Sequence, residues 1–166
     1  MIILDNIIFK LQNRGGVTNV WKAIVNTIVN SDDVNVVFVD DPKIKRLKAK
    51  ILKDSNLPLF IRRYLNVNVG SCGIFHSSYF RVHSSNNIKN IVTIHDFVYE
   101  KFEKGISKFI HLTQKKHALK KASAIICVSN NTKKDLLEYH PWINPDIVNV
   151  IYNGVDKSIY KPLPSK

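Results

Sequence analysis

The residues best suited to act on a ligand follow the ends of short apolar runs. His95 and Asp96 follow the run Ile91–Ile94, and Ser129 follows the run Ala124–Val128. An imidazole titrates near neutral pH, so it can take up or release a proton during a reaction, and a neighbouring carboxylate can tune or orient it. We therefore predict that His95 acts on a substrate, with Asp96 beside it. The alternative is a histidine that only packs at the end of a strand.

Gly15 and Gly16 are candidates for binding a phosphate group. They follow the first apolar run, Ile2–Asp5, and precede a stretch with helical spacing of apolar residues. Glycine lets a ligand come close to the backbone, and the N–H groups and dipole at the start of a helix attract anions. The alternative is an ordinary turn. Because the chain has neither the Gly-x-Gly-x-x-Gly pattern of dinucleotide-binding proteins nor the Gly-x-x-x-x-Gly-Lys-Ser/Thr loop of ATPases, we expect no cofactor.

Further candidates lie in and after the apolar run Ile74–His76. His76 ends this run, and the loop that follows carries Tyr79 and Arg81. A tyrosine ring can stack on a sugar or base, and a guanidinium can hold a phosphate or a carboxylate. The other histidines show no zinc-like spacing, so we expect no bound metal. Cys127 lies inside an apolar run and is predicted to be a buried thiol.

The elements that must position these residues follow from the spacing of the apolar residues. Residues 17–29 have helical spacing, and they lie between apolar runs at 2–5 and 34–39. A strand, a glycine loop, a helix and a second strand form a βαβ unit, which predicts an α/β fold with a parallel sheet. Ligands of such sheets bind at the carboxyl ends of the strands. We therefore expect Gly16 and His95 to converge along one edge of the sheet.

The rest of the chain continues the alternation of strands and helices. Short apolar runs predict further strands at 74–76, 91–95, 124–128 and 148–151. Helices are predicted at 107–121 and from the capping residues 129–131 to residue 139. In the first of these helices five lysines are expected to face outward. The residues expected to face inward are Ile106, Phe109, Ile110, Ala118 and Leu119.

Residues 43–65 form a basic stretch with a different pattern. Ile44, Leu47 and Ile51 keep helical spacing among lysines and an arginine, and an apolar, aromatic and basic segment follows Asn56. This pattern predicts an amphipathic helix that lies on an anionic membrane surface. The alternative is a solvated surface helix whose narrow apolar stripe packs on the sheet.

Length and charge bound the possible functions. A chain of 166 residues suffices for one domain with a core rather than two. Twenty-five Lys and Arg face 13 Asp and Glu, and the net charge of +12 indicates an anionic partner such as nucleic acid, anionic lipid or a phosphorylated substrate. A coding bias towards lysine would account for part of this charge. Because no apolar run is long enough to span a bilayer and the first residues lack a signal-peptide pattern, we expect a cytoplasmic protein.

Several parts of the chain, in order, resemble the N-terminal half of glycosyltransferase family 4, and most of all its bacterial O-antigen and capsule mannosyl- and rhamnosyl-transferases. These parts are Leu4–Phe9 with Gly15-Gly16-Val17 and Trp21, Phe75–Arg81, Val92–Phe97, Ala124–Asn130 and Val150–Asp156. The resemblance implies the GT-B arrangement, in which two Rossmann-like domains face a cleft. It implies that residues 1–156 form a Rossmann-like three-layer α/β/α domain with a mainly parallel sheet, and that residues 157–166 begin an interdomain linker.

The resemblance also implies a role for each candidate residue. In this family the N-terminal domain binds the acceptor, the C-terminal domain binds the nucleotide-sugar, and transfer usually retains the anomeric configuration without a metal. Gly15 and Gly16 would approach the donor diphosphate, and His95 would contact the reacting sugar or the acceptor hydroxyl. The other candidates would line the acceptor side or the rim of the cleft, namely His76, Tyr79, Arg81, Asp96 and Ser129.

The partners expected of such a domain follow from the same resemblance. The donor half is absent from these 166 residues, so we expect no transfer by the chain alone. The partners would be a nucleotide-sugar, held with a C-terminal domain or a separate donor-domain chain, and a glycan or polyprenyl-linked acceptor. Basic residues at 43–63 would dock the protein on the inner face of the plasma membrane. Nucleic acid is not expected, because no reader motif occurs; a basic nucleic-acid-binding or non-catalytic scaffolding module is the alternative.

Overall fold

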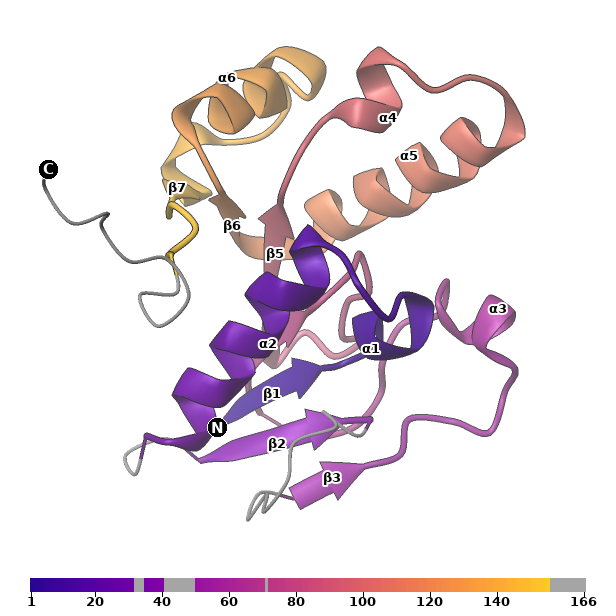
Figure 1. Ribbon diagram of the computed structural model, residues 1–166, viewed down its shortest axis with the longest axis vertical. Coiled ribbons are helices and arrows are strands. Elements are labelled where there is room, and N and C mark those ends of the chain that lie inside the picture. Colours follow the sequence, from indigo (N-terminus) through magenta and orange to yellow (C-terminus); the bar gives the residue numbers. More distant parts are fainter. Residues whose placement is uncertain (32–34, 41–49, 71, 156–166) are drawn as a thin grey trace, which may run out of the picture.

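A seven-stranded sheet forms the centre of the molecule in the computed structural model, which describes residues 1–31, 35–40, 50–70 and 72–155 (Figure 1). The strands are β1 (Ile2–Asp5), β2 (Val36–Val39), β3 (Lys50–Leu52), β4 (Gly73–Ser77), β5 (Ile88–Ile94), β6 (Ala122–Cys127) and β7 (Val148–Val150). Their order is β3-β2-β1-β4-β5-β6-β7, and every neighbouring pair is parallel. The structure therefore confirms the predicted Rossmann-like α/β fold.

Helices lie in the connections from β1 to β2, β3 to β4, β5 to β6 and β6 to β7, as is usual between parallel strands, whereas residues 78–87 join β4 to β5 without a helix. The α-helices are α1 (Ile8–Leu11), α2 (Gly16–Val29), α3 (Leu59–Arg62), α4 (Val98–Lys101), α5 (Gly105–Lys121) and α6 (Asn130–Tyr139), and a 3-10 helix spans Pro145–Ile147. The predicted helices at 17–29, 107–121 and 129–139 are thus confirmed to within two residues at each end. The short helices α1, α3 and α4 were not predicted.

The helices cover both faces of the sheet. Side chains of a strand alternate between its faces: Leu4 of β1 packs with Trp21 of α2, whereas Ile3 belongs to a cluster on the opposite face. The β5–β7 part of that opposite face packs against Leu119 of α5 and Leu136 of α6. In Figure 1, α2 crosses the front of the sheet. The predicted three layers are present.

The strand order reverses between β1 and β4. From β1 the chain adds β2 and β3 on one side, and it then returns to the other side of β1 to add β4, β5, β6 and β7. In open parallel sheets such a reversal leaves a crevice at the carboxyl ends of the two strands concerned, because the connections leave in opposite directions. The residues that follow β1 and β4 are therefore the first place to look for a ligand site.

The predicted inward face of α5 is wrong in its first half. Ile106 and Phe109 are 79% and 72% exposed, whereas Ala118 and Leu119 are buried as expected. One lysine of the predicted outer face, Lys115, is itself buried. Only the carboxyl-terminal half of α5 reaches the sheet, so the apolar residues of its first half have no core to face.

The predicted helix in the basic stretch is also wrong where the structure describes it. Residues 43–49 lie outside the described residues. Ile51 lies in strand β3, which pairs in parallel with β2, so the helical spacing does not continue through it. Arg62 of α3 is buried and forms an ion pair with Asp40, so its guanidinium does not reach an outside surface.

Among the described residues, no helix is long and apolar enough to cross a membrane, and no group of three metal-binding side chains comes together in the same part of the chain. Cys72, just before β4, is exposed, whereas Cys127 in β6 is buried as predicted. Burial raises the pKa of the Cys127 thiol to about 11.

Candidate functional site

The carboxyl ends of β1 and β4 are joined through Asp5, the last residue of β1. Ser77 Oγ donates to Asp5 Oδ2 at 2.8 Å, and Ser78 Oγ donates to the Asp5 carbonyl oxygen at 2.7 Å. Arg81 Nη1 donates to Asp5 Oδ1 at 3.1 Å. Burial raises the pKa of Asp5 to about 6, while Arg81 and Ser77 act in the opposite direction. Asp5 therefore holds the two strand ends together through the bonds to its carboxyl group and its carbonyl oxygen.

Helix α2 is fixed to this edge through Asn6, the residue after β1. Trp21 Nε1 donates to Asn6 Oδ1 at 2.8 Å, and Asn6 Nδ2 donates to the Asp40 carbonyl oxygen at 3.1 Å. Trp21 lies in the second turn of α2 and is 3% exposed. Because a buried amide and indole satisfy each other here, the amino-terminal half of α2 has a fixed position over the strand ends.

The start of α2 leaves its backbone amides accessible. Gly15 precedes the helix and Gly16 is its first residue; no side chain in the described chain caps the helix at Gly15, and its first turn has no acidic residue. A Cβ built on Gly16 would meet no atom within 4 Å, so space is open beside it. Uncapped N–H groups with open space and no nearby carboxylate suit an anionic ligand.

A small cavity joins α2 to the strand ends. Its volume of about 20 Å³ suits roughly one water molecule. Val17, the residue after Gly16, lines the cavity together with Thr93 and His95 from β5 and its end. The other residues that line it are Val20, Trp21, Ile24, Ser77 and Ser78. The helix start and the predicted imidazole thus lie on the same side of the sheet, as their positions after separate strands had suggested.

Two histidines near this cavity are held in the neutral form. Burial, with a smaller contribution from repulsion by a protonated His95, lowers the pKa of His76 to about 4. Burial also lowers the pKa of His95, with Asp96 opposing the shift. His76 Nε2 lies 2.9 Å from Thr93 Oγ1, and the His76 ring packs edge-on against Trp21 at 5.0 Å between centroids. A neutral imidazole can accept a proton or hydrogen-bond a hydroxyl, so His95 has the protonation state that the predicted role needs.

Asp96 and Ser129 are used locally by the fold. Asp96 is exposed, and its Oδ1 accepts from the Val98 amide at 3.1 Å at the start of α4. Ser129 Oγ accepts from the Thr132 amide at 3.0 Å, and this caps α6 as its sequence position had predicted. Both residues follow strands of the same sheet edge as His95, but neither lines the cavity.

Tyr79 and Arg81 make contacts within the protein that fit the predicted acceptor role less well. Tyr79 is half-buried, and its hydroxyl accepts from Arg63 Nη2 at 3.2 Å. The Arg81 side chain is fully buried, with its guanidinium engaged by Asp5 and Asp54. This correction has a simple reason, since a guanidinium paired with two carboxylates is not available to a ligand. The geometry favours a structural role for Arg81.

The sequence did not reveal the ion pair of Lys115 with Glu100. Lys115 Nζ lies 2.7 Å from Glu100 Oε1 and also donates to the Asp96 carbonyl oxygen at 3.1 Å. It therefore holds the segment that follows His95 against α5. Lys115 stands beside Lys116 in a lysine-rich helix, and nothing in the local pattern distinguishes it. Asp5, Ser77 and Ser78 could have been found from the sequence, because these polar residues end β1 and β4 or directly follow β4.

Comparison with known proteins supports one family. The sequence model described as Glycosyltransferase Family 4 matches residues 14–159 of this chain. A segment of 45 residues, 27% of this chain, is 38% identical to the alpha-maltose-1-phosphate synthase of Mycolicibacterium smegmatis. That segment covers 12% of the relative, so the similarity spans only a small part of that enzyme's length.

Proposed function

Because this chain belongs to glycosyltransferase family 4, we propose that it is the acceptor-binding, N-terminal domain of a retaining glycosyltransferase of the hexosyltransferase type. The enzyme transfers a sugar from a nucleotide-sugar to a glycan or glycolipid in surface polysaccharide synthesis. The observation that carries the proposal is the cavity at which the first turn of α2 meets His95. The O-antigen and capsule branch is proposed from the motifs quoted above.

The first turn of α2 binds the donor diphosphate in this proposal. Its free amides and the positive end of the helix dipole face an open space beside Gly16. The dipole contributes only about 0.3–1 kcal/mol at an exposed site, so close N–H contacts supply most of the attraction. These contacts strengthen as charge develops on the leaving diphosphate, which lowers the barrier to transfer.

His95 contacts the reacting sugar or the acceptor hydroxyl from the floor of the site. Its neutral ring offers one nitrogen as a donor and the other as an acceptor. Thr93 lies between the cavity and His76, so the His76–Thr93 contact fixes the wall beside His95. Tyr79, Asp96 and Ser129 border the acceptor side, whereas Arg81 acts by holding Asp5.

The donor-binding half completes the site. Binding of the nucleotide and much of the leaving-group stabilisation come from that half in this family, so we propose that residues 1–156 transfer no sugar by themselves. The half is supplied by a C-terminal domain or by a separate chain. The acceptor is a polyprenyl-linked or other membrane-bound glycan, and the protein works at the cytoplasmic face of the plasma membrane.

A transfer assay tests the proposal. The 166-residue chain is tested alone, and then joined to a donor-binding domain of the same family, with nucleotide-hexoses and a polyprenyl-linked glycan. We expect transfer only from the joined form, and a loss of about 10²–10⁴-fold in kcat for His95→Ala. His140→Ala is the matched control, since His140 lies outside the cavity and should keep normal turnover. Turnover by the chain alone, or full activity of His95→Ala, would contradict the proposal.

A further inference from the structure

A second and much larger pocket lies beside α5. Its volume is about 510 Å³, within the range of ligand sites, and it opens between α5 and the chain at residues 64–66 and 80–81. Its apolar lining comes mainly from Leu65, Phe80, Phe109 and Ile110. A pocket of this size and lining suits a hydrocarbon ligand.

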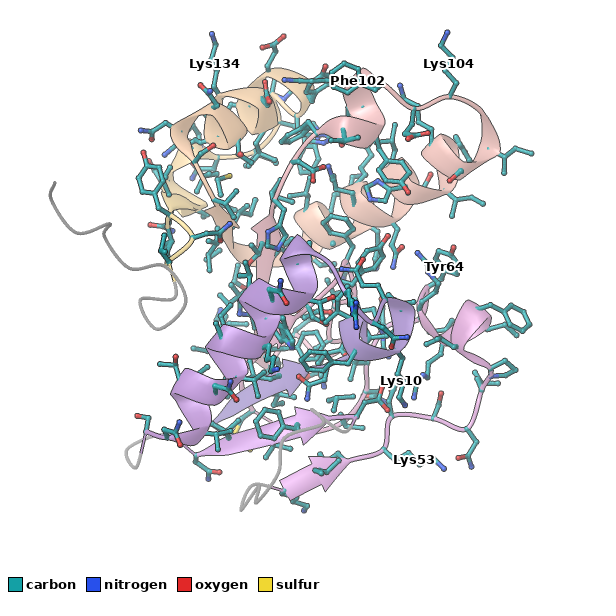
Figure 2. The ribbon with its side chains drawn as sticks, in the orientation of Figure 1. Lys10, Lys53, Tyr64, Phe102, Lys104 and Lys134 are labelled. Atoms are coloured by element: carbon teal, nitrogen blue, oxygen red, sulfur yellow. The ribbon has the colours of Figure 1, made fainter. Side chains whose placement is uncertain are left out.

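The apolar surface continues outside the pocket along α5. Ile106, Phe109, Ile110 and Thr113 recur at helical spacing, so they form one stripe, and the last three line the pocket. Ile106 is 79% exposed, and Phe102, which follows α4 just before α5 begins, is 74% exposed. Figure 2 shows Phe102 and Lys104 beyond the amino end of α5, and Tyr64 on the side of the molecule that α3 and α5 share. Clustered exposed side chains of this kind mark an interaction surface.

The charge along α3 and α5 is of one sign, while an exposed acidic residue, Glu103, stands beside Phe102 at the amino end of the surface. Residues 57–69 and 105–121, which contain α3 and α5, have no acidic residue. Arg62 and Lys115 are neutralised by Asp40 and Glu100, but Lys116, Lys120 and Lys121 remain exposed on α5. Exposed aromatic and aliphatic side chains flanked by lysines are typical of elements that lie on an anionic bilayer. In such elements the apolar side chains enter the lipid, and the lysines contact the head groups.

The pocket also lies close to the candidate site. Ser78 lines the small cavity, and Phe80, two residues later, lines the pocket. Two residues of chain span at most about 7 Å. A lipid whose hydrocarbon chain occupies the pocket could therefore place its head group near the carboxyl ends of β4 and β5.

We propose that this pocket binds the hydrocarbon chain of a membrane lipid, and that the face formed by α3 and α5 rests on an anionic bilayer. The charge and the apolar stripe favour this occupant over a second copy of the chain, which would place two basic faces together. The proposal goes beyond the proposed function, since it needs no sugar transfer. Only the identity of that lipid as the acceptor rests on the proposed function.

Sedimentation with vesicles tests the proposal. The 166-residue chain is mixed with vesicles of phosphatidylcholine, with and without phosphatidylglycerol. We expect binding to the anionic vesicles, and at least about tenfold weaker partitioning for Ile106→Ser with Phe109→Ser. The matched control is Ile151→Ser with Tyr152→Ser, which removes the same kind of exposed surface beside β7 and should leave binding unchanged.

A phosphatidylglycerol with a diazirine at the end of its acyl chain reports on the pocket. Light should attach it to the peptides that contain Leu65 and Ile110, and Thr113→Trp, which fills the pocket, should abolish this labelling while the chain still sediments. Equal binding to neutral and anionic vesicles, unchanged binding of the double serine variant, or labelling elsewhere would overturn the proposal. Self-association that the same variant abolishes, without vesicle binding, would assign the surface to a second copy instead. No sugar is used, so failure here and failure of the transfer assay are separate results.

Discussion

At the scale of single residues, burial decides the charge state of the site. Removal of their rings from water lowers the pKa values of both His76 and His95, and a charge on His95 would also disfavour a charge on His76. In the proposed site the amides at the start of α2 would bind the diphosphate, and the neutral ring of His95 would meet the hydroxyl.

We predict that His76 makes stability depend on pH. Its folded pKa of about 4 lies below the ordinary value of 6.5, so the unfolded chain binds the proton more readily. The free energy of unfolding therefore falls as the pH is lowered from about 6.5 to 4, by about 1–3 kcal/mol. Urea titrations of the wild type and of His76→Asn at several pH values measure the difference in free energy of unfolding between the two proteins. Asp5 contributes in the opposite direction, but it is present in both proteins, so its contribution cancels in this difference.

The difference in free energy of unfolding between the wild type and His76→Asn should shrink steadily as the pH is lowered from about 6.5 to 4. Nuclear magnetic resonance of the His76 ring should place its titration midpoint near 4. A midpoint near 6.5, together with a difference in unfolding free energy that does not vary with pH, would show that the ring is solvated in the folded protein.

At the scale of elements, the Lys115–Glu100 pair attaches α4 to α5. Both side chains are almost fully buried, and Lys115 Nζ also stands 4.3 Å from the centre of the Phe97 ring. Burial lowers the pKa of Lys115, and Glu100 counters this by accepting its hydrogen bond. Together with the bond from Lys115 Nζ to the Asp96 carbonyl oxygen, this pair holds the segment between His95 and α4 against α5.

We predict that Lys115→Met lowers the free energy of unfolding by about 3–5 kcal/mol, because Glu100 is left buried without a counter-charge. Adding Glu100→Gln should restore part of the loss, since the uncompensated charge is then gone. Lys116→Met is the matched control, because Lys116 is exposed and its loss should change stability by less than about 0.5 kcal/mol. Urea unfolding of the four proteins checks this; equal effects of the two single substitutions would refute it.

A helix and its inner face were predictable from the sequence where the apolar residues of that helix pack against the sheet. Trp21 and Val25 of α2 recur at helical spacing and are buried, so periodicity located the helix and its inner face correctly. The same reasoning failed for Ile106 and Phe109, because α5 extends beyond the sheet and its first half has no core to cover. Periodicity reports that a helix has an apolar side, but not whether protein, lipid or water lies against it.

At the scale of the whole molecule, Arg81 joins segments that are far apart in sequence. Its guanidinium contacts Asp5 at the end of β1 and Asp54 after β3, and its Nε donates to the Leu65 carbonyl oxygen at 3.2 Å. One side chain thus connects the β1 edge, the chain after β3 and the wall of the large pocket. The cavity and the pocket share this support.

We predict that Arg81→Met is among the most destabilising single substitutions in the chain, lowering the free energy of unfolding by about 3–5 kcal/mol. It leaves two buried carboxylates, Asp5 and Asp54, facing each other without a cation. Lys89→Met, on an exposed position of β5, should change stability by less than about 0.5 kcal/mol. Thermal unfolding monitored by circular dichroism compares the two variants, and a near-neutral Arg81→Met would mean that water or another group satisfies the carboxylates.

The fold class and the edge of the sheet at which the candidate residues lie were predictable from sequence, because both depend on local patterns. A strand that ends in a polar residue places that residue at a known edge, which is why Gly16 and His95 were correctly expected on one side. The partners of Arg81 and Lys115 were not predictable, because Asp5 and Glu100 lie 76 and 15 residues away from them and no periodicity encodes those pairs. Arg81 was therefore taken for a ligand contact.

The two cysteines differ in a way that offers a built-in reporter. Cys72 precedes β4 at the end of the sheet opposite the candidate site, and only its sulfur is open to reagents in the folded chain. A maleimide dye should therefore attach once to the native protein, at a point remote from substrates. Cys127, whose high pKa and burial suppress its reaction, should be modified only as the chain opens, so the appearance of a second attached dye by mass would report the opening of the core at β6.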